Sequence, residues 1–359
     1  MLNIILPIFG DINEGNLHDY ENQPLILKTV KEKPIVAWAL SHIDPLPIKK
    51  RYFVICNEKY INMHHLDKLL PLYTDNEIIF VRLKHNTQGM PCSILMAMDL
   101  IDEDEPVLVT SVDQYINTDL HSHLEHFKEI NCDAGCIGFQ SVHPKWSYAE
   151  VNEDNIIERV VEKVPISKNA LTSSYYFSSA RKMNGAIMSN ILRGKEVNDK
   201  YYLSSCLNEL IIDGKTVAFS KIDAEDYFNF YSKERVKEFE KYLQNQSNRI
   251  KQLTSRYAKL FNAADIEPLK QMFLPEVSLE DSFTPKILGF ESVVEFYTSL
   301  FNSVKILNFD PQIISLIDED TTMIKFKLQI DDDNYEGVDI LKFRSLKILS
   351  LSAYLHKIS

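Results

Sequence analysis

The chain has 359 residues, 45% hydrophobic and 11% aromatic, which is enough for two domains with well-filled cores. Its 51 Asp and Glu residues outnumber 39 Lys and Arg, and the net charge of −12 argues against a nucleic-acid or anionic-membrane surface, which needs a basic footprint. No apolar run approaches the roughly 18 residues of a membrane span, and residues 1–10 lack the basic start and cleavage site of a signal peptide. We therefore expect a cytoplasmic protein that binds neither nucleic acid nor membrane.

Strand-like and helix-like segments alternate through the first half of the chain. The strand-like runs are residues 3–9, 51–56, 77–81 and 106–112. The helix-like stretches between them are residues 35–42, 60–70 and 91–101. This alternation predicts an α/β fold with a mostly parallel sheet covered by helices on both faces.

Later strand-like runs lie closer together and predict an antiparallel extension of that sheet. They are residues 134–139, 148–151, 156–162, 174–178 and 216–221. Residues 152–155, Asn-Glu-Asp-Asn, have the turn chemistry of a hairpin.

The run 107–114, Val-Leu-Val-Thr-Ser-Val-Asp-Gln, ends in a carboxylate, Asp113. Ligands of open α/β sheets bind beyond the carboxyl ends of the strands, where such an aspartate can hold a divalent cation over a polyphosphate. The alternative is that Asp113 caps a turn or the next helix.

The pattern changes after residue 232. Residues 233–260 read as one long charged helix, or as two helices with a break near 244–248, and we place the domain boundary there: 1–243 and 249–359. The second part reads as helices followed by strands at 312–318, 321–330, 337–343 and 347–355, an α+β unit with a meander.

Four N-terminal segments together resemble the sugar-phosphate nucleotidyltransferases, particularly the branch found in capsule and surface-polysaccharide gene clusters. They are Asn-Thr-Gln-Gly-Met-Pro from residue 86, residues 110–115, Val-Glu-Lys-Val-Pro from residue 161, and Ser-Tyr-Tyr-Phe from residue 174. The resemblance implies a Rossmann-like, GT-A-like mixed sheet. It also implies an attack of a sugar phosphate on the α-phosphorus of a nucleoside triphosphate, with release of pyrophosphate.

The same resemblance assigns roles to individual residues. Mg²⁺ would be held by Asp113, with Asn229 where many relatives carry a second Asp, and Lys163 would position the attacking phosphate; the alternative for Lys163 is an ion pair on an exposed strand. The remaining assignments are the nucleotide-binding residues Gly10, Gln23, Gln88 and Gly89, and the sugar-phosphate residues Glu162 and Tyr176.

The first loop departs from the resemblance. The family opens with a glycine-rich loop that carries a basic residue and is followed by Pro-Lys-Pro-Leu, and these amides and cations cradle the triphosphate. Residues 9–26 here contain no Arg or Lys, have Gln23 at the lysine position, and carry four carboxylates: Asp11, Glu14, Asp19 and Glu21. Catalysis would need a cation from elsewhere, so a nucleotide-sugar-binding or scaffold protein without catalysis is an open alternative.

Residues 249–359 resemble the ketosteroid isomerase and SnoaL-like branch of the cone-shaped α+β fold shared with nuclear transport factor 2. The resemblance lies in residues 255–265, 273–281, 289–297 and 337–354. It implies a pocket with Tyr257, Asp281 and Asp339, in which burial would raise the pKa of a carboxyl group. Such a domain could bind a ligand, act as an isomerase or cyclase, or form a homodimer.

Overall fold

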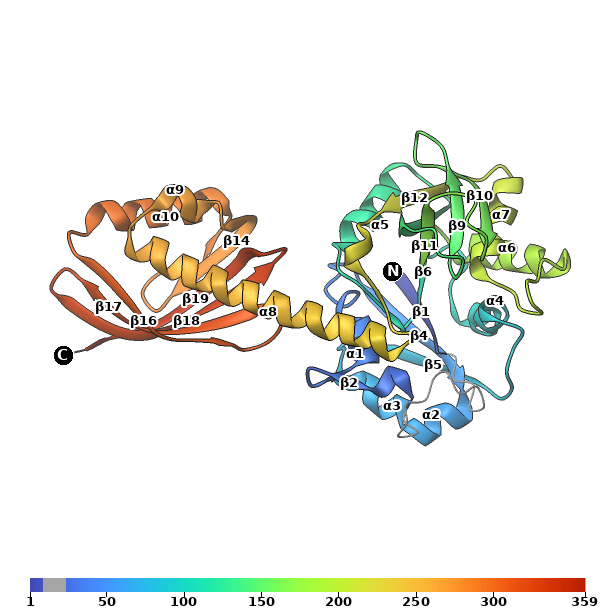
Figure 1. The fold of residues 1–359 in the computed structure, drawn as a ribbon, viewed down its shortest axis with the longest axis horizontal. Helices are drawn as coiled ribbons and strands as arrows, with labels where there is room; N and C mark the ends of the chain where they lie inside the picture. The colour runs from blue at the N-terminus through green and yellow to red at the C-terminus, as the bar shows by residue number, and fades with distance from the viewer. Residues whose placement is uncertain (9–23, 359) are drawn as a thin grey trace. The chain divides into compact units, whose positions relative to one another are not determined.

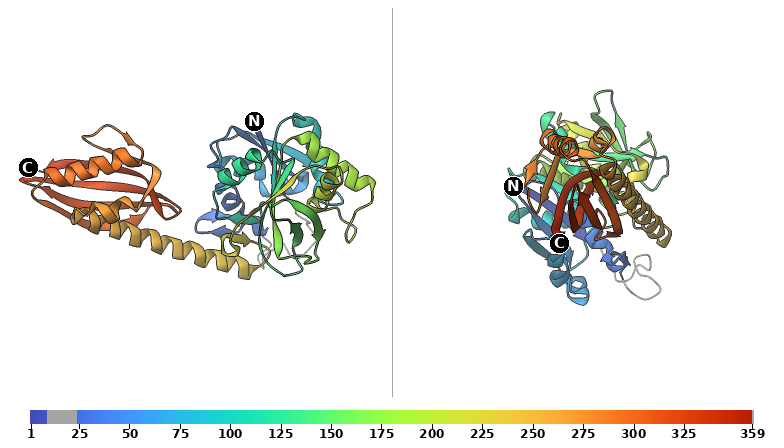
Figure 2. Two further views of the ribbon diagram at one scale, coloured as in Figure 1. Left: turned by 90° about the horizontal axis from the view of Figure 1, so that it is seen from above. Right: turned by 90° about the vertical axis from the view of Figure 1, so that its left-hand side faces the viewer.

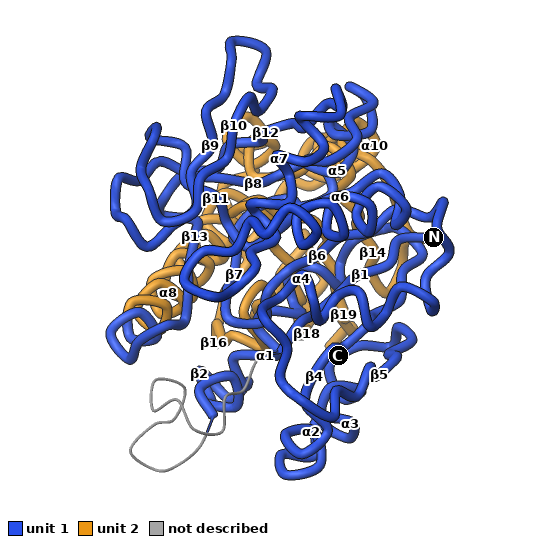
Figure 3. The backbone as a smooth tube through the Cα atoms, turned by 90° about the vertical axis from the view of Figure 1, so that its right-hand side faces the viewer, with its two compact units in different colours: residues 1–237 blue, residues 238–359 orange. Residues whose placement is uncertain are grey.

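The computed structural model describes residues 1–8 and 24–358. The chain divides into two compact units, Met1–Lys237 (unit 1) and Glu238–Ser359 (unit 2), which Figure 3 colours separately. The helix α8 (Lys233–Asn262) crosses this division without interruption, so the alternative of two helices is wrong. Both the division and the interval 244–248 that was predicted as the domain boundary lie within α8.

Unit 1 is built on a sheet of nine described strands with helices on both faces (Figure 1). The sheet strands are β1 (Leu2–Ile8), β4 (Lys50–Asn57), β5 (Ile78–Leu83), β6 (Val107–Thr110), β8 (Ala134–Gln140), β9 (Ser147–Val151), β10 (Ile157–Glu162), β11 (Asn169–Phe177) and β12 (Val217–Lys221). The main path is β10-β9-β11-β6-β1-β4-β5, and β8 pairs with β11 and β12. The segment β6-β1-β4-β5 is parallel, while β11 is antiparallel to β6, β8 and β9. The predicted parallel sheet with an antiparallel extension is therefore confirmed.

The core of unit 1 consists of two clusters, because successive side chains along each buried strand belong to different clusters. In β4, Val54 belongs to one cluster and Phe53 and Ile55 to the other. Successive side chains of a strand point to opposite faces, so each cluster covers one face of the sheet. The helices α1 (Ile35–Ser41), α2 (Glu58–His64), α3 (Leu66–Leu69) and α5 (Leu120–Glu129) contribute to the first cluster. The helices α4 (Met90–Ile94), α6 (Ala180–Leu192) and α7 (Leu203–Ile212) contribute to the second.

Two predicted helices are shorter than expected. The stretch 60–70 is split between α2 and α3 because His65 adopts a left-handed conformation with φ of 51°. The stretch 91–101 is α4 followed by a 3-10 helix, η3 (Leu95–Leu100). The other short elements of unit 1 are η1 (Leu25–Leu27), β2 (Thr29–Val30), β3 (Lys33–Pro34), η2 (Leu70–Leu72), β7 (Gln114–Ile116), η4 (Ala224–Asp226) and β13 (Tyr227–Asn229).

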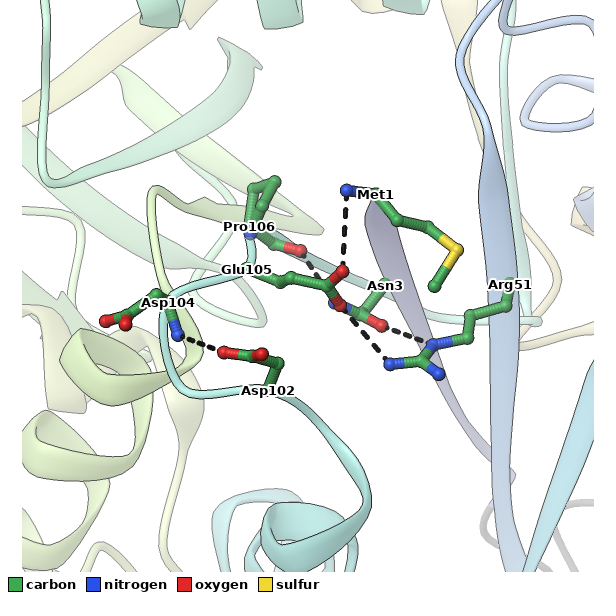
Figure 4. A network of polar contacts seen from close by, with 7 residues as sticks. All are labelled: Met1, Asn3, Arg51, Asp102, Asp104, Glu105 and Pro106. Carbon is green, nitrogen blue, oxygen red and sulfur yellow. Dashed lines mark hydrogen bonds and ion pairs between the residues drawn. The ribbon is translucent and has the colours of Figure 1, made fainter.

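A polar network fixes the amino-terminal end of the parallel strands (Figure 4). Arg51 at the start of β4 donates from Nε to Asn3 Oδ1 at 2.8 Å and lies 3.2 Å from Glu105 Oε2, just before β6. Asn3 in β1 is fully buried and donates to the same carboxylate oxygen at 3.0 Å. These contacts lock three neighbouring strands in register at the end away from their carboxyl termini.

Unit 2 is an α+β unit with six described strands on one side of its core (Figures 1 and 2). The sheet order is β15-β14-β19-β18-β17-β16, with β14 and β19 parallel and the other pairs antiparallel. The elements are α9 (Ile266–Lys270), β14 (Phe273–Asp281), β15 (Ile287–Leu288), α10 (Phe290–Ser303), β16 (Leu307–Leu316), β17 (Thr321–Ile330), β18 (Asp333–Arg344) and β19 (Lys347–Ile358). Its core takes residues from α8, α9, α10 and the sheet. This arrangement is compatible with the predicted cone.

Candidate active site

A cavity of about 500 Å³ opens in unit 1 where several loops meet. One wall comes from the segments that follow β1, β4 and β5, and the described residues of this wall carry no charge: Ile8, Asn57, Leu83, Asn86, Thr87, Gly89, Met90 and Ser93. The other wall holds all the described charged residues of the cavity: Lys145, Glu162, Lys163 and Lys200. Among the described lining residues, charge is therefore confined to one side of the cavity, which holds three lysines and one glutamate.

The turn at Gln88 and Gly89 joins the two walls. Tyr201 N donates to Gln88 O at 2.8 Å, and Gly89 forms a β-bridge with Tyr201. Gly89 has φ of 119°, and a Cβ atom there would lie 2.3 Å from the carbonyl oxygen of Tyr201. Only glycine fits this approach. Of the predicted nucleotide-binding pair, Gly89 lines the cavity, whereas the exposed Gln88 takes part through its backbone.

Glu162 and Lys163 are consecutive residues at the end of β10, and both line the cavity. Glu162 is buried, and its Oε2 accepts hydrogen bonds from the hydroxyl groups of Ser147 and, at 2.8 Å, Ser204. Lys163 donates from Nζ to the Tyr202 hydroxyl at 2.8 Å, and this bond raises the pKa of Lys163. Lys163 is therefore a cation with a fixed position at neutral pH.

Asp113 follows β6 and is half-buried. It accepts a hydrogen bond from the Ser111 hydroxyl, while burial raises the pKa of its carboxyl group. Asp113 itself does not line the cavity, but Ser173 does, and Ser111 N donates to Ser173 O at 3.2 Å. The predicted metal carboxylate is thus at the strand end, one residue layer from the cavity.

The short pair of strands β7 and β13 brings Asn229 next to Asp113. Asn229 is opposite Gln114 in the register, and Phe230 N donates to Asp113 O at 2.8 Å. Asn229 is 3% exposed, and its Oδ1 has no hydrogen-bond partner among the described residues. Buried amide oxygens are usually hydrogen-bonded, so this atom is an available acceptor within the described part of the chain.

Tyr231 connects Asp113 to the cavity. It lines the cavity, its hydroxyl group bonds to Ser173, and the charge of Asp113, followed by burial, raises its pKa. The same charge acts on Tyr227, whose buried hydroxyl group has no partner among residues 1–8 and 24–358.

The oxygen atoms around Asp113 suit Mg²⁺. This ion binds proteins through one or two carboxylates and keeps several water molecules and substrate phosphates as its other ligands. The Asp113 carboxylate and the Asn229 Oδ1, which has no partner among the described residues, are oxygen donors of that kind. Within the described residues there is no group of three His, Cys, Asp or Glu side chains that could hold a metal ion by themselves.

Tyr176 is not part of the cavity, which corrects the prediction for this residue. Its side chain is buried in the first core cluster and stacks on Phe127, with ring centres 5.8 Å apart. Its neighbour Tyr175 points to the opposite face of β11 and lines the cavity. The pairing with β6 explains the difference, because Tyr176 is opposite Leu108, a residue of the first cluster. The predicted residues Gly10 and Gln23 lie outside the described part of the chain.

The prediction missed most of the described lining residues, among them two lysines and a tyrosine with polar groups in the cavity. Lys145, Lys200 and Tyr202 lie in or beside turns, and only contacts between distant segments bring them to the cavity.

In unit 2, the three predicted pocket residues lie near one another. Asp281 and Asp339 are both in register with Ala353, on the strands that flank β19. Burial, and then the charge of Asp281, raise the pKa of Asp339 to about 8. The Tyr257 hydroxyl is 3.2 Å from that of Tyr297, and burial raises the pKa of both, with a smaller contribution from the charge of Asp339. Asp281 Oδ1 also accepts from Phe283 N and Thr284 N at 2.7 and 2.6 Å, which fixes the following turn.

Comparisons with known proteins find the fold among solved structures only. No family model and no curated protein matches the chain. A nucleoside-diphosphate-sugar pyrophosphorylase from Vibrio cholerae RC9 is similar at 14% identity and a TM-score of 0.57, covering 67% of this chain and 100% of its own. A UDP-glucose pyrophosphorylase in complex with UDP-glucose is similar at 14% identity and a TM-score of 0.52, and the match covers 68% of this chain and 98% of that protein. A UTP-bound UGPase from Acinetobacter baumannii is similar at 15% identity and a TM-score of 0.51, and the match covers 67% of this chain and 92% of that protein.

The fold of the chain therefore includes the mixed α/β fold of sugar nucleotidyltransferases. The 67% of the chain that the Vibrio cholerae structure matches corresponds in size to unit 1. No described helix has both the length and the apolar character to cross a membrane.

Proposed function

We propose that the protein transfers a nucleotidyl group from a nucleoside triphosphate to a sugar or polyol phosphate and releases pyrophosphate. The observation that carries this proposal is the cavity lined by Glu162, Lys163 and Tyr231, together with Asp113 after the end of β6, whose charge acts on Tyr231. The similarity to pyrophosphorylases in fold is consistent with it. We further propose that the reaction serves surface, or capsular, polysaccharide synthesis in the cytoplasm, with the protein as a homodimer.

Each residue has a distinct task in this reaction. Glu162 accepts hydrogen bonds from sugar hydroxyl groups in the way that it now accepts them from Ser147 and Ser204. Lys163 holds the acceptor phosphate and directs one of its oxygen atoms to the α-phosphorus. A new phosphorus–oxygen bond forms as the bond to the β-phosphate breaks, and pyrophosphate leaves with the electron pair. Asp113 and Asn229 would hold Mg²⁺, which stabilises the charge of the phosphates when it is bound.

The direct test is pyrophosphate release. The purified protein is incubated with Mg²⁺, each nucleoside triphosphate and a panel of sugar and polyol phosphates. We expect release with one pair of substrates and a loss of at least 100-fold for Asp113→Ala. The matched control is Asp154→Ala, which changes an exposed aspartate of the β9–β10 hairpin. Activity that survives in Asp113→Ala contradicts the proposed role of this residue.

The second candidate is a nucleotide-sugar-binding or scaffold protein without catalysis, whose C-terminal cone binds a small ligand or forms the dimer. The observation that favours it is the first loop, which carries four carboxylates and no Arg or Lys. Retained binding of a nucleotide sugar in calorimetry, with no pyrophosphate released from any pair of substrates, would establish this candidate over the first. For unit 2, the buried Asp339 among the hydroxyl groups of Tyr257 and Tyr297 supports a polar ligand site of the isomerase-like kind. Asp281→Asn should weaken ligand binding without unfolding the unit.

A further inference from the structure

Strand β10, which brings Glu162 and Lys163 to the cavity, is at the end of the main path of the sheet in unit 1. It is antiparallel to β9, and Lys163 N continues this pairing with a hydrogen bond to Trp146 O at 3.1 Å. In an antiparallel pair, the N–H and C=O groups of every second residue point away from the partner strand. The position of such a strand is therefore poorly fixed unless these outward groups find another partner.

The side chain of Asn208 in α7 acts as a substitute for a further strand beside β10. Val160 N donates to Asn208 Oδ1 at 2.9 Å, and Asn208 Nδ2 donates to Val160 O at 2.8 Å. One amide group thus supplies both the acceptor and the donor that the backbone of a neighbouring strand would supply. Val160 is only 3% exposed, so the loss of Asn208 would leave both of its backbone groups with little access to water.

Two more side chains from the start of α7 bond to residues further along β10. Ser204 lies one turn before Asn208 on the same face of the helix, and its hydroxyl group donates to Glu162 Oε2 at 2.8 Å. Tyr202, at the N-cap of α7, accepts the hydrogen bond from Lys163 Nζ at 2.8 Å. The helix therefore holds the backbone of β10 and both of the side chains that β10 brings to the cavity.

Asn208 is the one of these three residues that binds the backbone of β10, and it does not line the cavity. Apolar packing also joins the strand to the helix, because Val160 and Leu207 belong to the same core cluster. Such packing has no preferred direction, whereas a pair of hydrogen bonds resists movement of the strand along its own axis. A displacement of about 1 Å is enough to cost on the order of 100-fold in a reaction that depends on orientation.

We propose that Asn208 is a positioning residue of the acceptor site, which fixes β10 so that Glu162 and Lys163 are held where the sugar or polyol phosphate binds. This inference rests on the proposed function and adds a residue that acts through two others. A purely structural residue would change the stability of the fold alone. A positioning residue changes the acceptor side of the cavity and leaves the nucleotide side, at Gly89, as it is.

The first test needs no ligand and follows the ammonium group of Lys163 in the full-length protein. Reductive methylation with isotope-labelled formaldehyde gives each lysine an NMR signal, and the Lys163 signal is identified by its absence in Lys163→Gln. Lys163 Nζ lies 4.9 Å from the centre of the Tyr202 ring, so the ring shifts this signal. Asn208→Ala should move the signal towards the position of a solvent-exposed lysine, because β10 is no longer fixed against α7.

The second test uses the nucleoside triphosphate and the sugar or polyol phosphate that the pyrophosphate assay identifies. Asn208→Ala should raise KM for the acceptor phosphate on the order of tenfold. KM for the nucleoside triphosphate should stay within about twofold of that of the unaltered protein, because the acceptor side alone is displaced. A general loss of folded protein would lower kcat and change neither KM.

Asn152→Ala is the matched control. Asn152 is in the turn at the opposite end of β10, and its Oδ1 accepts from Asp154 N and Ile156 N at 3.0 and 2.9 Å. Both variants remove an asparagine side chain with two hydrogen bonds to the backbone of the same hairpin, so both should lower the melting temperature. Asn152→Ala should change neither the Lys163 signal nor KM for the acceptor.

Asn208→Asp provides the test if the alanine variant does not fold. A carboxylate keeps the acceptor for Val160 N but places a second oxygen against Val160 O, so the same displacement is expected. An unmoved Lys163 signal, an unchanged KM for the acceptor, or equal effects of Asn152→Ala overturns the proposal. If the unaltered protein releases no pyrophosphate, the nucleotidyl transfer is wrong, and the Lys163 signal then decides alone whether Asn208 positions Glu162 and Lys163.

Discussion

Asn229 is the residue that best reports on the metal site. It is buried, the next residue in the chain, Phe230, is hydrogen-bonded to the backbone of Asp113, and its amide oxygen has no partner in the described part of the chain. Asn229→Asp would place a second carboxylate there, and without metal the two acids would repel each other in a poorly solvated position. We expect a lower melting temperature in chelator, with a cost of about 1–3 kcal/mol, and a larger rise on adding Mg²⁺ than the unaltered protein gives.

Differential scanning fluorimetry with and without Mg²⁺ measures both effects. Asn155→Asp, in the exposed hairpin between β9 and β10, is the control and should respond to neither condition. Equal stabilisation of Asn229→Asp and of the unaltered protein by Mg²⁺ would show that Asn229 is not a metal ligand.

Asp339 makes the stability of unit 2 depend on pH. Its pKa of about 8 in the fold is far above the ordinary value for Asp, so the folded chain holds a proton that the unfolded chain releases. The stability from this proton is fully present below about pH 4 and is lost as the pH rises to about 8. Asp339→Asn removes the titration, and its stability relative to the unaltered protein should increase by about 1 kcal/mol per pH unit across that window.

Hydrogen exchange of the β18 and β19 amides, compared between the two proteins at each pH, follows this change. Glu336→Gln, on the same strand and half-buried, serves as the control. If the difference in stability between Asp339→Asn and the unaltered protein stays constant from pH 5 to 8.5, Asp339 is ionised in the fold.

At the level of elements, the turn at Gly89 couples the two walls of the cavity. Gly89→Ala would force a Cβ atom to 2.3 Å from the Tyr201 carbonyl oxygen at a φ of 119°, so the turn must move away from Tyr201. We expect a loss of roughly 1–3 kcal/mol of stability and weaker binding of sugar phosphates, because Tyr201 stands between Lys200 and Tyr202, which both line the cavity. Thermal unfolding measures the loss of stability, and titration calorimetry measures the binding of sugar phosphates.

Gly185→Ala is the matched control for this substitution. Gly185 lies in α6, and no atom is within 4 Å of the Cβ position. Alanine favours the helix there and should add about 0.5–1 kcal/mol of stability. If both variants behave alike, the contact between Gly89 and Tyr201 does not hold the cavity together.

Local patterns predicted the elements but not the side of β11 that forms the site. Asp113 was found because a buried run ends in a carboxylate, a signal contained in eight consecutive residues. The choice between Tyr175 and Tyr176 depends on which neighbour β11 pairs with, a contact over more than 60 residues that no local pattern contains. Lys200 was missed for the same reason, because a backbone bond to the distant Gln88 anchors its turn.

At the scale of the whole molecule, each unit has a core of its own. The last buried residues of the two clusters of unit 1 are Tyr227 and Phe219, and the cluster of unit 2 begins at Ile250, so the cores share no residue. The sequence pattern alone predicted two domains, because the order of strands and helices changes after residue 232. It did not predict that α8 is continuous, because the polar residues 244–248 read as a break in the helix. Separate cores predict separate cooperative transitions.

Matched core truncations test this independence by calorimetry. Leu6→Ala removes buried side-chain volume from the first cluster of unit 1, and Leu341→Ala removes the same volume from the core of unit 2. Both leucines are almost fully buried, so each variant should lose about 2–5 kcal/mol. Because the loss is confined to one core, Leu6→Ala should lower one transition temperature and Leu341→Ala the other. A single transition that moves with both variants would mean that the two cores unfold together, and the pH dependence of Asp339 would then extend to the stability of the cavity in unit 1.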